Sequence, residues 1–240
     1  PPRRPLAPLP RGAPLGARFR PGKLDRVEAA PALPDLRVHL EAHGRRVLNG
    51  SNAFSLEVSK VRQDLALRRH HVLTPQTIAV VGGPDRLQRA ARSLPLPFIT
   101  KHNQGGKGLG VKLFHDLETF DAYVEGGEFV HSPDGITLLQ QYVRPASPHI
   151  TRVEIVGGVF QYAIKSNTEG GFELCPAKEC DASDAFCPVG GTGKFNLDES
   201  VHADHPLVQA YIRLMADEGL DVAGIEFVEG EDGRLYTYDI

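Results

Sequence analysis

The chain has 240 residues, of which 41% are hydrophobic and 24% are charged, and its formal net charge is -3. These values predict a soluble globular protein of one or two domains with room for a full hydrophobic core. The near-neutral balance argues against nucleic acid as a partner, and no apolar run approaches the roughly 18 residues that would cross a membrane.

The three cysteines, Cys175, Cys180 and Cys187, are an odd number. An odd count argues against a complete disulfide framework, so we expect free thiols and a reducing, cytoplasmic location. The spacing of the cysteines also lacks the paired C-x2-4-C pattern of zinc sites. The sequence leaves the role of this segment open.

Residues 1–22 are rich in proline, arginine, glycine and alanine. Such a segment buries too little apolar surface to offset its ordering entropy, so we expect it to be disordered. A basic arm for RNA is the less favoured alternative, because its five arginines are spread out. We expect both ends of the chain to be cut.

The regular elements are predicted from apolar periodicity and turn residues. Helices are expected over 54–71, over 84–94, after the N-cap Asp116, and over 206–219. Strands are expected over 74–81, 97–101, 110–114 and 135–143.

A first hairpin is predicted over 150–165, with Gly157 and Gly158 as its two-residue turn. This turn places Ile155 opposite Phe160. The apolar face would then hold Thr151, Val153, Ile155, Phe160, Tyr162 and Ile164, with Val153 opposite Tyr162. The other face would carry Arg152, Glu154, Gln161 and Lys165, a polar surface that is equally compatible with simple exposure to solvent.

A second hairpin is predicted over 222–240, with its turn at 230–233. In the expected register Glu226 lies opposite Thr237, and Gly224 lies opposite Asp239. The apolar face would hold Ile225, Phe227, Tyr236, Tyr238 and Ile240. Glu226 and Asp239 would then emerge on the other face as diagonal neighbours, with backbones roughly 7–8 Å apart. Two converging carboxylates suit a magnesium ion, although two solvated acids fit the pattern as well.

The segment FITKHNQGGKGLGVKLF, residues 98–114, places four glycines between two predicted strands. No Ser or Thr follows Lys107, and a strand rather than a helix follows the glycines, so neither common nucleotide-binding glycine motif fits. A glycine-rich loop between antiparallel strands can form a flap whose backbone N–H groups lie over phosphates. A loose hairpin loop is the alternative, and the loop alone favours it.

Four segments together resemble the ATP-grasp superfamily, and most closely the RimK-type α-L-glutamate ligases. They are NGSNAFSLEVSKVRQDLALRRHHVLTPQTIAV, PFITKHNQGGKGLGVKLF, LLQQYVRPASPHITRVEIVGG and AGIEFVEGEDGRLYTYDI, and the resemblance covers about residues 45–240. It implies an α+β ATP-grasp fold with two lobes, each with an antiparallel sheet and helices. Residues 46–138 would form the lobe with the flap and 139–240 the lobe with the metal-binding acids, with ATP between them. Residues 1–45 would combine the Pro/Arg-rich segment with the remnant of an α/β domain that usually precedes the fold in this family.

The resemblance also implies roles for individual residues. Lys60 and Lys101 would bind the α- and β-phosphates, and Arg152 would meet the γ-phosphate or an acyl phosphate. Glu226 and Asp239 would hold magnesium or manganese; the family usually has a further asparagine ligand two residues after the second acid, beyond Ile240. The flap and the adenine-binding hinge would comprise Gln104, Gly105, Gly106, Lys107, Gly108, Gly110, Gln140, Gln141, Tyr142 and Val143.

The function that the resemblance implies is an ATP- and magnesium-dependent carboxylate–amine ligase, with glutamate as a candidate substrate. The partners would be ATP with a small carboxylate and an amine, or with a peptide or protein terminus; homo-oligomerisation stays open. Two alternatives remain: an ATP-grasp kinase that phosphorylates a hydroxyl, and a non-catalytic ATP-binding module. The sequence identifies neither the acyl acceptor nor the amine.

Overall fold

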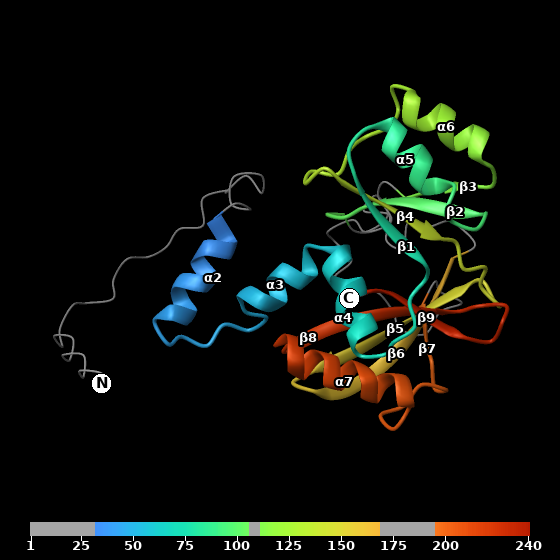
Figure 1. Cartoon of the computed structure of the whole chain (residues 1–240). Helices are drawn as coiled ribbons and strands as arrows, with labels where there is room; N and C mark the ends of the chain where they lie inside the picture. Colours follow the sequence, from blue (N-terminus) through green and yellow to red (C-terminus); the bar gives the residue numbers. More distant parts are fainter. Residues whose placement is uncertain (1–31, 106–110, 169–194) are drawn as a thin grey trace, which may run out of the picture.

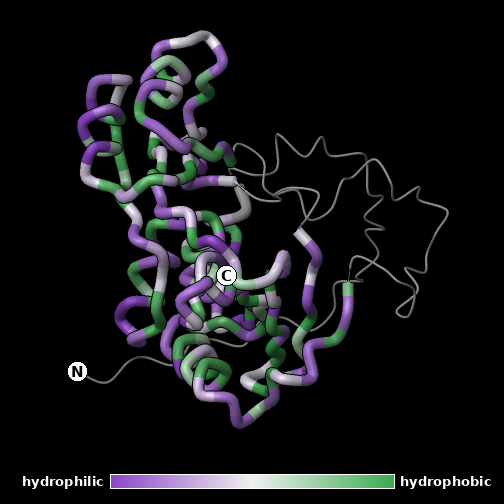
Figure 2. The backbone as a smooth tube through the Cα atoms, turned by 90° about the vertical axis from the view of Figure 1, so that its right-hand side faces the viewer, coloured by the Kyte–Doolittle hydropathy of each residue, from purple (hydrophilic) through white to green (hydrophobic). Residues whose placement is uncertain are grey.

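Two antiparallel sheets, each covered by helices, form the body of the protein in a computed structural model (Figure 1). The structure describes residues 32–105, 111–168 and 195–240. Figure 2 shows the two bodies from the side, one above the other, with hydrophobic residues distributed through both. No helix in the described part of the chain combines the length and the apolar character that a membrane crossing requires.

The first sheet has four strands in the order β1-β4-β2-β3. They are β1 (Thr77–Val81), β2 (Phe98–His102), β3 (Lys112–Phe114) and β4 (Ile136–Gln141). Helices α5 (Pro84–Ala91) and α6 (Leu117–Glu125) pack on this sheet, and α6 begins after the predicted N-cap Asp116, which accepts a hydrogen bond from the Thr119 amide at 2.8 Å. The buried cluster that joins them contains Val80, Leu87, Ala91, Leu94, Phe98, Phe114, Phe120, Val124 and Leu139.

The second sheet has five strands in the order β7-β6-β5-β8-β9. They are β5 (His149–Val156), β6 (Val159–Asn167), β7 (Phe195–Leu197), β8 (Val222–Glu229) and β9 (Leu235–Asp239). Helix α7 (Pro206–Glu218) packs against it and ends at Gly219, whose φ of 71° suits glycine at a helix C-terminus. The buried cluster beneath the sheet includes Val153, Ile155, Val208, Tyr211, Leu214 and Ile225.

The prediction of a single helix over 54–71 is wrong near its start, where the helix is interrupted at residues 58–59. The segment forms α3 (Ser51–Glu57) and α4 (Lys60–Arg69), because Ser59 adopts an extended conformation and its side chain accepts a hydrogen bond from the Arg62 amide. Serine is a favoured N-cap, and here it begins a new helix at Lys60. Both helices contribute to the cluster of the second sheet, although the sequence prediction grouped them with the first lobe.

The first hairpin turns at Gly157 and Gly158 as predicted, and Ile155 lies opposite Phe160. An irregularity between Glu154 and Ile155 then shifts the register, so Val153 pairs with Ala163 instead of Tyr162. The extra residue exchanges the faces of the partner strand. Ala163 is therefore buried, and the predicted core position of Tyr162 is wrong, since this side chain is 45% exposed.

Two elements were not predicted, α2 (Ala32–Ala42) and the short strand β7. Helix α2 is joined to α3 through Glu41, whose carboxylate accepts hydrogen bonds from the Ser51 amide at 2.7 Å and the Ser51 hydroxyl at 2.6 Å. The Arg37 guanidinium lies 4.2 Å from the centre of the Phe54 ring. Most of the irregular segment that carries the three cysteines lies outside the described residues.

Candidate active site

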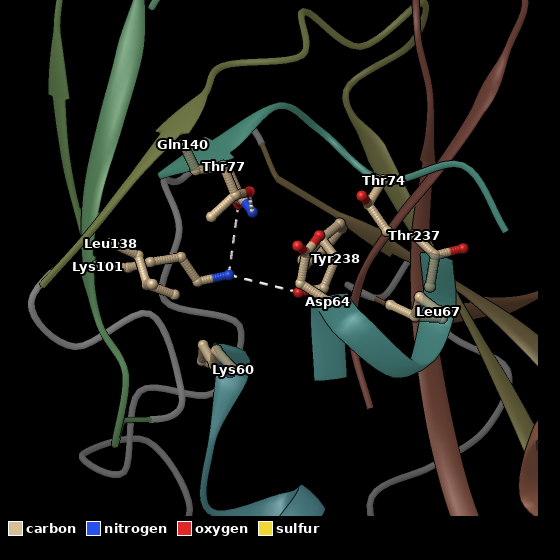
Figure 3. A pocket seen from close by; sticks show the side chains of 10 residues that line it. All are labelled: Lys60, Asp64, Leu67, Thr74, Thr77, Lys101, Leu138, Gln140, Thr237 and Tyr238. Carbon is tan, nitrogen blue, oxygen red and sulfur yellow. Dashed lines mark hydrogen bonds between the residues drawn. The ribbon is translucent and has the colours of Figure 1, made fainter. Parts of the chain in front are cut away.

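A pocket lies where the first sheet, helix α4 and strand β9 meet, between the two bodies (Figure 3). Because each side of it comes from a different part of the chain, only the folded protein brings these groups together. Residues that line the pocket are Lys60, Asp64, Leu67, Thr74, Thr77, Lys101, Leu138, Gln140, Thr237 and Tyr238.

Lys101 is the most deeply placed cation of this pocket, with only 6% of its surface exposed. Its ammonium donates to the Gln140 side-chain oxygen at 3.5 Å and to the Tyr238 carbonyl at 3.4 Å (Figure 3). Gln140 is itself oriented by donating to the Thr77 hydroxyl at 2.8 Å. Burial lowers the pKa of Lys101 to about 8, and Lys60 acts in the same direction while Asp239 opposes it.

The two candidate metal ligands lie closer than the sequence register predicted. An irregularity between Glu226 and Phe227 places Glu226 directly opposite Asp239, and Phe227 opposite Thr237. The predicted diagonal arrangement is therefore wrong, and so is the single apolar face. Tyr236 and Tyr238 leave the core face and pack in a small separate cluster that also contains Val143, Ile150 and Val228.

Each of the two acids forms an ion pair with a basic residue that, by the resemblance, would contact the phosphates of ATP. Lys60 contacts the Asp239 carboxylate at 2.5 Å, and Arg152 contacts the Glu226 carboxylate at 3.2 Å. Burial raises the pKa of Glu226, Asp239 adds to this effect, and Arg152 opposes it. In this arrangement each acid neutralises one basic side chain. A metal ion could replace the basic side chains as the partner of the acids, and phosphates could replace the acids as the partners of the basic side chains.

The acid pair fits a magnesium ion on chemical grounds. The neighbouring Asp239 carboxylate raises the cost of ionising Glu226, and a hard divalent cation would relieve that cost. Across the described ranges, no group of three or more His, Cys, Asp or Glu side chains gathers around one point. Glu226 and Asp239 would therefore supply two ligands, which matches the way magnesium joins one or two carboxylates to substrate phosphates.

The predicted flap is described only at its start. The Gln104 amide donates to the Ser132 hydroxyl at 3.3 Å, and Gly105 is exposed. Four further predicted flap residues, Gly106, Lys107, Gly108 and Gly110, lie outside the described residues. Their contact with phosphates therefore stays a prediction.

The predicted hinge, residues 140–143, covers the end of β4 and the two residues after it, between the two bodies. The Gln141 amide donates to the Gln76 carbonyl at 2.8 Å, and the Tyr142 amide donates to the Pro97 carbonyl at 3.1 Å. Both amides are thus engaged with the backbone, so adenine recognition here would depend on other hinge groups. Val143 packs against the small cluster of tyrosines.

Asn103 is a site residue that the sequence prediction missed. It is 3% exposed, its backbone carbonyl accepts from the Lys60 amide at 3.2 Å, and its side-chain oxygen accepts from the Val61 amide at 2.9 Å. Its side-chain amide donates to Asp134. Asn103 thereby joins the root of the flap to the start of α4, and only its position directly before the glycine loop pointed to it.

The lowered pKa of Lys101 predicts a pH-dependent affinity for nucleotide. Phosphate binding needs the ammonium form, which is depleted above the pKa of about 8. We expect the affinity for ADP to fall by up to about tenfold per pH unit between pH 8 and 9.5, with uptake of a proton on binding. Calorimetry in buffers of different ionisation enthalpy measures both quantities. Lys101→Arg should remove the slope, and a slope that persists in this variant would contradict the assignment.

No protein-family model matches the chain. A probable alpha-L-glutamate ligase of Mannheimia succiniciproducens is 26% identical over 199 residues, which covers 82% of this chain and 60% of that protein. The chain therefore spans about three fifths of the length of this curated relative.

Solved structures show the same architecture. A RimK domain ATP-grasp protein from Sphaerobacter thermophilus superposes with a TM-score of 0.59 at 18% identity, over 86% of this chain and 67% of that one. The ATP-grasp ligase PsnB, complexed with a precursor variant, Mg and ADP, superposes with a TM-score of 0.58 at 16% identity, over 88% and 58%. The α+β fold in two sheets is thus the ATP-grasp fold.

Proposed function

We propose that the protein is an ATP- and magnesium-dependent carboxylate–amine ligase. The observation that carries the proposal is the arrangement of the pocket, where the buried cation Lys101 lies beside the acid pair Glu226 and Asp239. Cations for phosphates and carboxylates for a metal are the groups that phosphoryl transfer requires. The curated relative is named a probable alpha-L-glutamate ligase. This name supports the reaction class and makes glutamate a candidate substrate.

The proposed reaction has two steps. A substrate carboxylate oxygen attacks the γ-phosphorus of ATP, the bond to the β-phosphate oxygen breaks, and an acyl phosphate and ADP result. An amine then attacks the acyl carbon, loses a proton and expels phosphate, which leaves an amide. A magnesium ion held by Glu226 and Asp239 would neutralise charge on the phosphate oxygens.

The side chains of the pocket would serve the first step by position and charge. Lys101 would meet the α- and β-phosphates from the sheet side, and Lys60 would exchange Asp239 for a phosphate oxygen. Arg152 presents a planar fork that matches phosphate oxygens, which suits it to the group in transfer. Burial around Lys101 keeps water away and strengthens each of these interactions.

Trapping of the acyl phosphate tests the ligase proposal. The protein is incubated with ATP, magnesium and a panel of carboxylates that includes glutamate, with and without hydroxylamine. We expect a hydroxamate and a matching amount of ADP, because hydroxylamine attacks an acyl phosphate but not a phosphate ester. ADP release with a phosphorylated hydroxyl and no hydroxamate would instead identify a kinase, and nucleotide binding without any turnover would identify a binding module.

A further inference from the structure

The guanidinium of Arg152 lies flat against the second sheet, over Gly224. Arg152 on β5 faces Glu226 on β8, and Gly224 is the residue two positions before Glu226. A Cβ atom added at Gly224 would overlap the Nη2, Cζ and Nε atoms of Arg152. The guanidinium therefore occupies the place of the missing side chain, and no other residue type at this position would leave it there.

Two carboxylates hold the guanidinium over this gap. Its Nε donates to Glu154 at 2.6 Å, and its Nη1 donates to Glu226 at 3.2 Å. Glu154 stands two residues from Arg152 on β5, so both side chains lie on the same face of the strand. The Glu154 side chain is 22% exposed and the Arg152 side chain 44%, so the ion pair is partly shielded from solvent.

The two carboxylates differ in what else they would bind. Glu226 is a proposed metal ligand, and a metal ion would compete with Arg152 for its oxygens. Arg152 would then lose one of its two partners when the metal arrives. Glu154 faces Gly224 across the strands and belongs to no proposed metal site, so its bond to Nε can persist and keep the guanidinium in place.

We propose that Gly224 and Glu154 are positioning residues that hold Arg152 for the terminal phosphate. Gly224 provides the space in which the guanidinium lies, and Glu154 holds the guanidinium by a hydrogen bond when Glu226 binds the metal. This inference rests on the proposed function, which places Arg152 at the γ-phosphate. It assigns roles to two residues that otherwise belong to a polar, partly exposed sheet surface.

The test compares the binding of ADP with the binding of a non-hydrolysable ATP analogue, both with magnesium, by calorimetry. Only the analogue carries the terminal phosphate. In Gly224→Ala and in Glu154→Gln we expect the affinity for the analogue to fall about tenfold, as for loss of a charged hydrogen bond, while ADP affinity stays within about twofold. The ratio of the two affinities isolates Arg152, because general damage to the fold would weaken both ligands.

Double variants and a matched control complete the experiment. If both residues act through Arg152, neither substitution should lower the analogue affinity further in an Arg152→Gln background. Gly127→Ala, at a glycine where an added Cβ meets no atom within 4 Å, should change neither affinity. Analogue binding that stays at the wild-type level in both Gly224→Ala and Glu154→Gln overturns the proposal.

The single variant Arg152→Gln separates this proposal from the function on which it rests. If Arg152→Gln lowers the analogue affinity while Gly224→Ala and Glu154→Gln do not, the positioning roles fail and the proposed function stands. If Arg152→Gln itself leaves the analogue affinity unchanged, the role of Arg152 at the terminal phosphate fails, and the positioning proposal is overturned with it.

Discussion

Lys101→Met should abolish nucleotide binding. The ammonium of Lys101 is buried between Gln140 and the carbonyl of Tyr238, where little water screens it. Methionine keeps the shape of the stem but removes the charge that phosphates would meet. We expect the affinity for ADP, measured by calorimetry with magnesium at pH 7, to fall by at least about 100-fold, the upper range for a charged hydrogen bond.

A second lysine of the same sheet provides the control. Lys112 on β3 has a half-exposed side chain and contacts Glu128 at 3.5 Å. Lys112→Met should leave ADP affinity unchanged, within about twofold, because exposed ion pairs contribute little. A melting temperature at or above that of the wild type for Lys101→Met would show that the fold is intact, since the substitution removes a buried charge. ADP affinity that survives in this intact variant would sink the assignment of the pocket to nucleotide.

Loss of the acid pair should remove the dependence of binding on magnesium. In Glu226→Gln and in Asp239→Asn one carboxylate becomes a neutral amide, a much weaker ligand for a hard cation. We expect magnesium to strengthen ADP binding in the wild type and to have little effect in either variant, with turnover lower by at least about 100-fold where a substrate is known. Titration of ADP with and without magnesium measures the difference.

The control for this pair is an acid of the same hairpin that lies outside the pocket. Asp232 accepts hydrogen bonds from Arg234 at 2.7 Å and from the Tyr236 hydroxyl at 2.7 Å. Asp232→Asn should keep the full effect of magnesium on ADP binding. A magnesium effect that survives in both Glu226→Gln and Asp239→Asn would move the metal site elsewhere.

Much of the fold could be predicted from local pattern. Alternation of apolar residues located the strands of both sheets except β7, and Asp116 marked the start of a helix because its side chain caps that helix. The turn at Gly157 and Gly158 was predictable because both residues need a positive φ. The interruption of a helix was not predicted: one helix was expected where Ser59 begins a second one.

The register errors share one physical cause. Each long hairpin contains one irregularity, after Glu154 in the first and after Glu226 in the second. An inserted residue exchanges the faces of a strand, and it leaves no mark in the alternation of apolar residues when both faces are partly buried. Tyr162, Tyr236 and Tyr238 were therefore placed on the wrong side, because tyrosine suits a core and a cleft equally well.

The residues of the candidate site also fall into those that the sequence predicted and those that it did not. Lys101, Glu226 and Asp239 were predicted from their order along the chain, from the hairpin register and from the resemblance to a known family, and the structure places Lys101 in the pocket and the two acids beside it. Asn103 and Gly224 were not found, since their roles depend on contacts with distant segments. A buried asparagine and a strand glycine carry no signal in a single sequence until the neighbouring chain is in place.

The first turn of α4 has a consequence for how the pocket can attract phosphate. The amide of Lys60 donates to the Asn103 carbonyl, the amide of Val61 to the Asn103 side chain, and the amide of Arg62 to Ser59. A helix N-terminus with three free amides is a common cradle for anions, but here the donors are already taken. Attraction of the nucleotide then depends on side-chain charges. Salt screens those that are partly exposed, such as Arg152, so we expect nucleotide binding to weaken at high ionic strength.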